Sequence, residues 1–157
     1  PCPTVELQGD QLGKAIPVLS ALSPVDVQFD DKQPTGFLAD ENLILYPSGA
    51  SDEEVLARLP ADIVLATAAQ CYAEVGNEEY LHQMALAVSV EVCGRLGISP
   101  PADAADRLNG LRAHIPAGEE RRALEEVREM AKVFGDTVCK ELDLQRPRSD
   151  LQRAEER

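Results

Sequence analysis

The sequence has no tryptophan, and its three tyrosines and three phenylalanines make the aromatic fraction only 4%. Proteins that bind single-stranded nucleic acid stack bases on aromatic side chains, so this composition does not favour such a role. Basic residues are also few, with 15 against 28 acidic residues, which gives a formal net charge of −13. A negative surface repels phosphate backbones, and we therefore expect no direct nucleic-acid binding.

Long apolar runs are missing as well. The longest uncharged apolar run, residues 63–73, is far shorter than the roughly 20 residues that a membrane span needs. No basic segment followed by an apolar block occurs in the first 20 residues, so we expect a cytoplasmic protein without a signal peptide. The length of 157 residues predicts one domain over residues 1–144, followed by a charged, disordered tail at 145–157.

The cysteines and glycines form none of the usual motifs. The four cysteines, Cys2, Cys71, Cys93 and Cys139, contain no CxxC pair, which excludes a structural zinc site of the common type. We expect them to be buried thiols in a reducing compartment. The glycines match neither G-x-G-x-x-G nor G-x-x-x-x-G-K, so no phosphate-binding loop is predicted.

The first third of the chain predicts one helix and a small sheet. Apolar residues at helical spacing indicate a helix over residues 10–22. Strict alternation of apolar and polar residues over 25–30 indicates a half-buried strand. Residues 36–39 and 42–46 flank the polar pair Asp40-Glu41, as expected of a β-hairpin. We predict a small antiparallel sheet of about three strands.

From Ser51 onward the pattern is helical. Ser51 and Glu54 form a capping box at the start of a helix that should run to residue 74 through Pro60. The helix at 79–96 is apolar nearly all round and should be central, whereas the helix at 119–142 has one apolar stripe. With a short helix near 103–112, the prediction is an α+β fold in which the sheet packs beside a bundle of about five helices.

Three segments carry a resemblance to a known family. Residues 42–47 read Asn-Leu-Ile-Leu-Tyr-Pro, residues 51–54 read Ser-Asp-Glu-Glu, and residues 88–98 read Val-Ser-Val-Glu-Val-Cys-Gly-Arg-Leu-Gly-Ile. Their pattern and order resemble those of the ImmA/IrrE and ArdC-like zincin metallopeptidases over roughly residues 5–142. The resemblance implies a zincin-like fold, with the family's HExxH helix at residues 51–74 and its third ligand on the next helix.

The ligand positions that the resemblance implies have lost their metal-binding side chains. Residues 61–65, Ala-Asp-Ile-Val-Leu, stand where the family has HExxH. Ala61 and Leu65 replace the two imidazoles, Asp62 stands in place of the glutamate, and Met84 and Leu86 occupy the region of the acidic ligand. We therefore expect a degenerate site without metal or other cofactor, in a protein that is not an enzyme.

Each of these residues also has a plain structural interpretation. Asp62 is either a relic carboxylate that binds a partner's Arg or Lys, or an early-turn acid that follows Pro60. Leu65, Met84 and Leu86 suit a hydrophobic core as well as a pocket. The remaining candidates are His82 with Cys71, Glu78 and Glu79 as a surface site, and His82 with Cys71 or Cys93 as a nucleophilic pair. A solvated helix histidine and inert buried thiols fit this sequence better. His114, the other histidine, lies on a different element.

The function that these expectations favour is a non-catalytic, metallopeptidase-like module that regulates a protein partner, in a mobile-element, phage or plasmid system. We expect an exposed sheet edge to dock the partner by strand addition. The residues expected at this edge are Phe37, Leu43, Ile44, Leu45 and Tyr46. Acidic residues at 52–54 and 119–129 would steer the encounter.

Two other functions remain open at this stage. An acidic decoy could block the basic face of a DNA-binding protein, although acidic and basic residues alternate on the last helix. An active hydrolase with atypical ligands is the third possibility.

Overall fold

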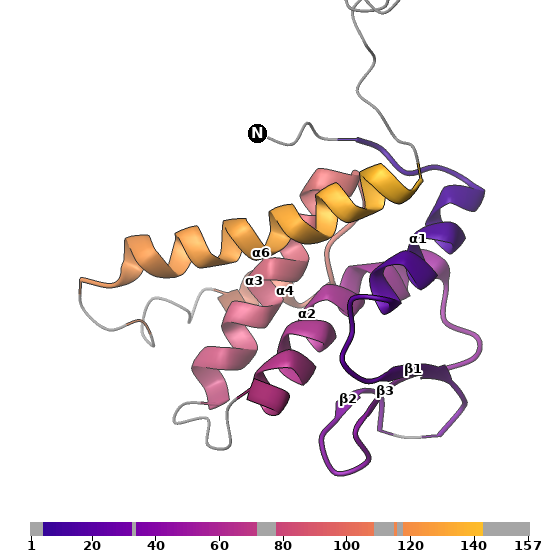
Figure 1. The fold of residues 1–157 in the computed structure, drawn as a ribbon, viewed down its shortest axis with the longest axis horizontal. Coiled ribbons are helices and arrows are strands. Elements are labelled where there is room, and N and C mark those ends of the chain that lie inside the picture. The colour runs from indigo at the N-terminus through magenta and orange to yellow at the C-terminus, as the bar shows by residue number, and fades with distance from the viewer. Residues whose placement is uncertain (1–4, 33, 72–77, 109–114, 116–117, 143–157) are drawn as a thin grey trace, which may run out of the picture.

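The computed structural model describes residues 5–32, 34–71, 78–108, 115 and 118–142. Within these residues the fold is α+β, a small sheet beside a helical bundle, as the sequence predicts (Figure 1). The tail at 145–157 and His114 lie outside the described residues. The elements in chain order are α1 (Asp10–Ser20), β1 (Asp26–Phe29), β2 (Gly36–Leu38), β3 (Leu43–Tyr46), α2 (Asp52–Cys71), α3 (Glu78–Leu96), α4 (Ala104–Leu108) and α6 (Glu120–Glu141).

The sheet is mixed, with the strand order β1-β3-β2. β2 and β3 form the expected antiparallel hairpin, and Asn42 in the turn adopts a positive φ of 55°, which asparagine tolerates. β1 pairs with β3 in parallel, so the prediction of an antiparallel sheet is wrong for this strand. Alternating polarity identifies a strand but carries no information on its direction or neighbour. The hairpin turn fixes β2 beside β3, and β1 occupies the other edge of β3.

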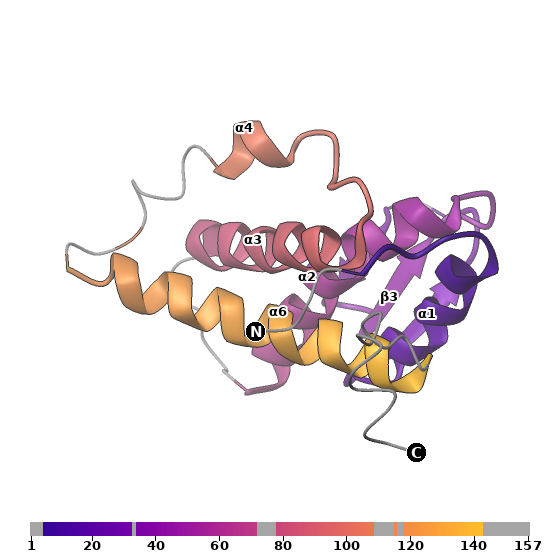
Figure 2. The ribbon, with the colours of Figure 1, turned by 90° about the horizontal axis from the view of Figure 1, so that it is seen from above.

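The helices form a packed layer on one side of the sheet. α2 packs against β2 and β3 and also against α3, while α3 packs against α6. Seen from above, α3 lies between α4 and α6 (Figure 2). Leu56 and Leu59 of α2 and Val88 and Val92 of α3 are fully buried, which confirms the central position predicted for the helix at 79–96. None of the helices in the described part of the chain is long and apolar enough to cross a membrane.

α2 runs through Pro60 without ending, and α3 supports it there. Proline has no N–H, so the carbonyl of Leu56 lacks its regular helical donor. Side chains of α3 bond to the backbone of α2 on either side of this proline. The N–H of Ala61 donates to Ser89 Oγ at 2.8 Å, and the Cys93 thiol lies 3.9 Å from the carbonyl oxygen of Ala57. These contacts fix the segment of α2 that contains residues 61–65 against α3.

Candidate functional site

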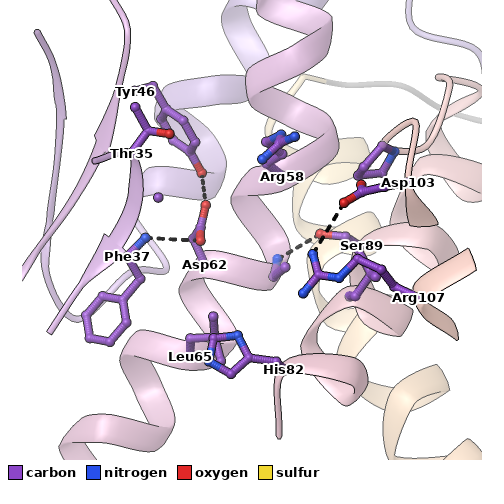
Figure 3. Close-up of a pocket in the computed structure, with 14 residues that line it drawn as sticks. Thr35, Phe37, Tyr46, Arg58, Asp62, Leu65, His82, Ser89, Asp103 and Arg107 are labelled. Carbon is purple, nitrogen blue, oxygen red and sulfur yellow. Dashed lines mark hydrogen bonds and ion pairs between the residues drawn. The ribbon is translucent and has the colours of Figure 1, made fainter. Parts of the chain in front are cut away.

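A cavity of about 200 Å³ opens between β2, α2, α3 and the loop that leads into α4 (Figure 3). Its walls include the segment that the sequence singled out. α2 contributes Arg58, Ala61, Asp62 and Leu65, and α3 contributes His82, Leu86 and Ser89; Thr35, Gly36, Phe37, Tyr46, Pro101, Asp103 and Arg107 complete the lining. The cavity is therefore lined by residues of the segment 61–65, in which the family resemblance would place metal ligands.

Asp62 is held by the two strands of the hairpin. Its Oδ1 accepts the backbone N–H of Phe37 at 3.1 Å, and its Oδ2 accepts the hydroxyl of Tyr46 at 2.5 Å. Gly36 makes this approach possible, because a Cβ there would lie 3.2 Å from Asp62 Oδ1 and its φ of 93° disfavours other residues. Because α2 begins at Asp52, Asp62 lies in the middle of the helix, and its interpretation as an early-turn acid is wrong.

Burial and hydrogen bonding act in opposite directions on the Asp62 carboxyl. Loss of hydration is the largest effect and raises its pKa above the usual value. The hydrogen bonds from Tyr46 and Phe37 and the charges of Arg58 and His82 lower the pKa but do not outweigh burial. Burial, followed by the neighbouring carboxylate, raises the pKa of Tyr46 well above its usual value, so this phenol stays a proton donor. Its ring also packs against Phe29, with centroids 6.0 Å apart.

Three side chains that can carry positive charge line the same cavity, in a chain with a net charge of −13. Arg107 lies 3.7 Å from Asp103, an exposed i,i+4 pair. Arg58 forms no ion pair with any residue that the structure describes. Figure 3 shows both guanidinium groups on the side of the cavity away from Tyr46. His82 is exposed, as expected of a solvated helix histidine, but it also faces this cavity.

The structure brings together four of the five residues predicted for the degenerate site. Ala61, Asp62, Leu65 and Leu86 line the cavity. Met84 does not: it is 5% exposed and belongs to the hydrophobic core. On a helix, residues two positions apart point in different directions, so Met84 and Leu86 do not share a face.

Sequence reasoning missed the two arginines. Arg58 stands one helical turn before Asp62, and this i,i+4 spacing was a usable signal. Arg107 is 45 positions further along the chain than Asp62, and only the tertiary fold brings it to the cavity.

The prediction that β3 forms an exposed sheet edge is wrong, whereas β2 is an edge strand as predicted. Leu43, Ile44, Leu45 and Tyr46 form β3, which is the central strand and pairs on both sides. Its backbone groups are therefore engaged and cannot receive another strand. Phe37 does lie on an edge strand, β2, but its N–H already donates to Asp62. Strand addition at these residues is thus disfavoured.

One of the alternative catalytic arrangements, the pair of His82 and Cys93, does not form. His82 and Cys93 lie eleven positions apart on the same helix, α3, which corresponds to roughly 16 Å along its axis. Burial, the largest effect, raises the pKa of the Cys93 thiol to about 12, so it is a poor nucleophile. In the described part of the chain, no group of three or more His, Cys, Asp or Glu is placed to hold a metal ion. The side chains of Cys71 and Glu78 lie outside the described residues, so the arrangements of His82 with these residues stay predictions.

A second cavity of about 460 Å³ adjoins the first and shares Arg58 and Pro101 with it. It follows α2 back toward its N-terminus, between Ser51 and Glu54 on one side and residues 99–102 on the other. The N–H of Ser99 donates to Glu53 at 3.1 Å and ties the two walls together. We call the two cavities together the α2 groove.

The lining of the α2 groove combines hydrocarbon with a small number of polar side chains. Ala61, Leu65 and Leu86 present hydrocarbon where the resemblance would require metal ligands, and both oxygens of Asp62 accept hydrogen bonds within the protein. In the first cavity, the exposed polar groups that a ligand would meet are the two arginines, His82, Asp103 and the hydroxyl of Thr35, whereas Ser89 is completely buried.

The similarity to zincin metallopeptidases consequently rests on the sequence pattern alone. Comparison of the chain with protein-family models, with curated proteins and with solved structures gives no match.

Proposed function

We propose that this chain is a non-catalytic, metallopeptidase-like module that works by binding a segment of a partner protein in the α2 groove. The observation that supports the proposal is the position of the cavity at residues 61–65, the segment that the resemblance aligns with HExxH. The groove at this segment is bordered by polar side chains, whereas Ala61, Leu65 and Leu86 contribute apolar side chains that cannot bind a metal. Binding needs only the groove, whereas zincin catalysis also needs ligands for a metal.

The geometry changes the expected mode of docking. β3 is central in the sheet, so the partner would lie along α2 rather than add a strand to β3. Main-chain pairing would then contribute less, and side-chain contacts with the groove walls would decide affinity. Acidic residues at the entrance, such as Glu54, would influence the encounter rate.

Nothing on α6 favours the acidic decoy over this proposal. The acidic side chains there pair with arginines one turn away, as in Arg121–Glu125 at 3.4 Å and Arg122–Glu126 at 3.5 Å. A decoy needs an uninterrupted array of negative charge, and these pairs interrupt it.

The proposal includes a cytoplasmic location. Cys93 is completely buried and forms no disulfide with any residue that the structure describes. A free thiol is typical of proteins in a reducing compartment, where disulfides are rare.

Blocking the groove tests the proposed function. Twelve-residue peptides selected by phage display on the wild-type protein would be measured by fluorescence anisotropy against two variants. Ala61→Trp fills the cavity, whereas Ala69→Trp places the same side chain on an exposed face of α2 outside the groove. We expect Ala61→Trp to weaken binding by more than about tenfold and Ala69→Trp to leave it unchanged, with similar melting temperatures.

Two results would contradict the proposal. Equal affinity of the selected peptides for both tryptophan variants would show that binding occurs elsewhere. Cleavage of a selected peptide, detected by mass spectrometry and abolished by a chelator, would show that the protein is a metal-dependent enzyme.

A further inference from the structure

We infer that the partner segment anchors in the α2 groove through a glutamate or aspartate side chain that Arg58 and Arg107 bind. This inference rests on the proposed function and adds to it the chemistry of the bound group. It predicts an acidic residue in an extended segment, bound by a protein that is itself strongly acidic. The whole-molecule charge would repel such a segment, so the attraction must be local.

Arg58 is available for a ligand. It is exposed, lines both cavities of the α2 groove and forms no ion pair within the described residues. Among the described residues, Arg107 forms an ion pair only with Asp103, at 3.7 Å and with about half of each side chain in solvent. Such pairs contribute little, so a better carboxylate partner can replace Asp103. A guanidinium group matches a carboxylate with two parallel hydrogen bonds.

Asp62 makes a cationic anchor less suitable. Each of its oxygens already accepts one hydrogen bond, from Tyr46 or from the N–H of Phe37, so fewer acceptor sites are left for an incoming ammonium. That ammonium would also meet Arg58 and Arg107 across the same cavity. The sequence-based option that Asp62 binds a partner's Arg or Lys is therefore disfavoured by its surroundings.

The extent of the groove favours a peptide over a small anion. Arg58 stands at the junction of a cavity of about 200 Å³ and one of about 460 Å³, so space continues from the anchor toward the start of α2. An isolated ion would leave the larger cavity unused. Asp62 and Asp103 border the smaller cavity, and they would repel a doubly charged phosphate more strongly than a singly charged carboxylate.

Short synthetic peptides test the charge of the anchor. The isotope-labelled full chain would be titrated with acetyl-Ala-Ala-Glu-Ala-Ala-amide, and with the same peptide carrying Gln or Lys at its centre, at about 0.15 M salt. We expect the Glu peptide to shift the amide signals of Phe37, Asp62 and Leu86, and to bind about tenfold more tightly than the Gln peptide. Non-specific attraction to an acidic protein would instead favour the Lys peptide, so a preference for Glu is diagnostic.

Charge-matched variants then test the two arginines. Arg58→Gln and Arg107→Gln should each weaken the Glu peptide about tenfold and reduce the difference between the Glu and Gln peptides. Arg128→Gln removes the same charge from an exposed position on α6 that does not line the groove, and it should have no effect. All three side chains are exposed, so melting temperatures should stay close to that of the wild type.

The remaining outcomes would overturn the inference, and they can be distinguished from a failure of the proposed function. Equal binding of the Glu and Gln peptides, or tightest binding of the Lys peptide, overturns the carboxylate anchor. Sodium acetate that shifts the same signals with the affinity of the Glu peptide overturns the peptide as occupant. In these cases the phage-selected peptides would still distinguish Ala61→Trp from Ala69→Trp. If that distinction also fails, the proposed function is wrong.

Discussion

The hydroxyl of Tyr46, on the central strand, donates a hydrogen bond of 2.5 Å to the carboxylate of Asp62 on α2. The other carboxylate oxygen accepts the N–H of Phe37 at 3.1 Å, so one side chain connects both strands of the hairpin to the helix. Asp62 is thus both a wall of the cavity and a structural tie between sheet and helix. Changes at this residue should therefore affect stability as well as any binding in the α2 groove.

A double-mutant cycle should detect this tie. Tyr46→Phe removes only the hydroxyl and keeps the ring that packs against Phe29. Asp62→Ala removes the acceptor of the same bond. Because each single change already breaks the hydrogen bond, we expect the free energies of unfolding to be non-additive, with a coupling of about 1–2 kcal/mol. Urea denaturation of the four proteins measures this coupling. Additive losses would mean that the two side chains do not interact in solution.

The raised pKa of Asp62 predicts a specific pH dependence of stability. Because burial raises the pKa in the folded state, the folded protein holds this proton more tightly than the unfolded chain does. The stability linked to the protonated carboxyl is fully present below the ordinary pKa of an aspartate, and it is lost as the pH rises through the folded value.

Asp62→Asn removes this titration, and comparison with it isolates the effect. The unfolding free energy of the wild type minus that of the variant should fall as the pH rises from about 4, by at most about 1.4 kcal/mol per pH unit. Urea titrations of both proteins over the same pH series measure the difference, in which other titrating groups cancel. A difference that grows with pH would mean that the hydrogen bonds outweigh burial and that the folded pKa is lowered.

Local signals in the sequence were sufficient for the elements of the fold. The capping box predicted the start of α2, and the Ser51 hydroxyl indeed accepts the N–H of Glu54 at 3.2 Å. The hairpin of β2 and β3 followed from two apolar runs around Asp40-Glu41. These features depend on residues within a few positions of one another, so a single sequence contains the necessary information.

Features that depend on distant residues were not predicted. Nothing within residues 26–29 tells whether β1 joins β3 in parallel or antiparallel fashion, because the alternation of apolar and polar residues is the same for both directions, and Phe29 of this strand is 47% exposed. Of the residues that line the cavity, the sequence predicted only some of those that α2 and α3 contribute. Arg107 comes to it through the packing of α4 on α3, and no local pattern encodes that contact. The spacing of apolar residues on α6 also predicts a buried Leu124, but its side chain is 47% exposed.

Burial of Cys93 should protect it from alkylation. Its side chain is inaccessible in the folded protein, and burial raises its pKa to about 12, so little thiolate forms at pH 8. We expect iodoacetamide at pH 8 to modify Cys139, which is partly exposed, well before Cys93. Peptide mass spectrometry gives the two rates separately. In concentrated urea both cysteines should react at similar rates, and equal rates in the native protein would contradict the burial of Cys93.

Two glycines near the end of α3 should respond in opposite ways to substitution by alanine. Gly97 has a φ of 69°, and a Cβ there would lie 2.9 Å from the Cα of Glu6 and from the carbonyl oxygen of Val5. Both contacts are with backbone atoms, which cannot rotate away. Gly97→Ala must therefore displace residues 5–7, whose N–H groups donate to the last carbonyls of α3 (Val5 to Arg95 at 2.8 Å, Leu7 to Leu96 at 2.9 Å).

We expect Gly97→Ala to lower the free energy of unfolding by about 2–3 kcal/mol, through backbone strain and weakened hydrogen bonds. Gly94 is the matched control, because it lies inside α3, is exposed, and a Cβ added to it would meet nothing within 4 Å. Gly94→Ala should raise stability by up to about 1 kcal/mol, since alanine favours a helix more than glycine does. Urea denaturation distinguishes the two variants directly. If both substitutions were neutral, the segment at 5–7 would not be packed on the end of α3 in solution.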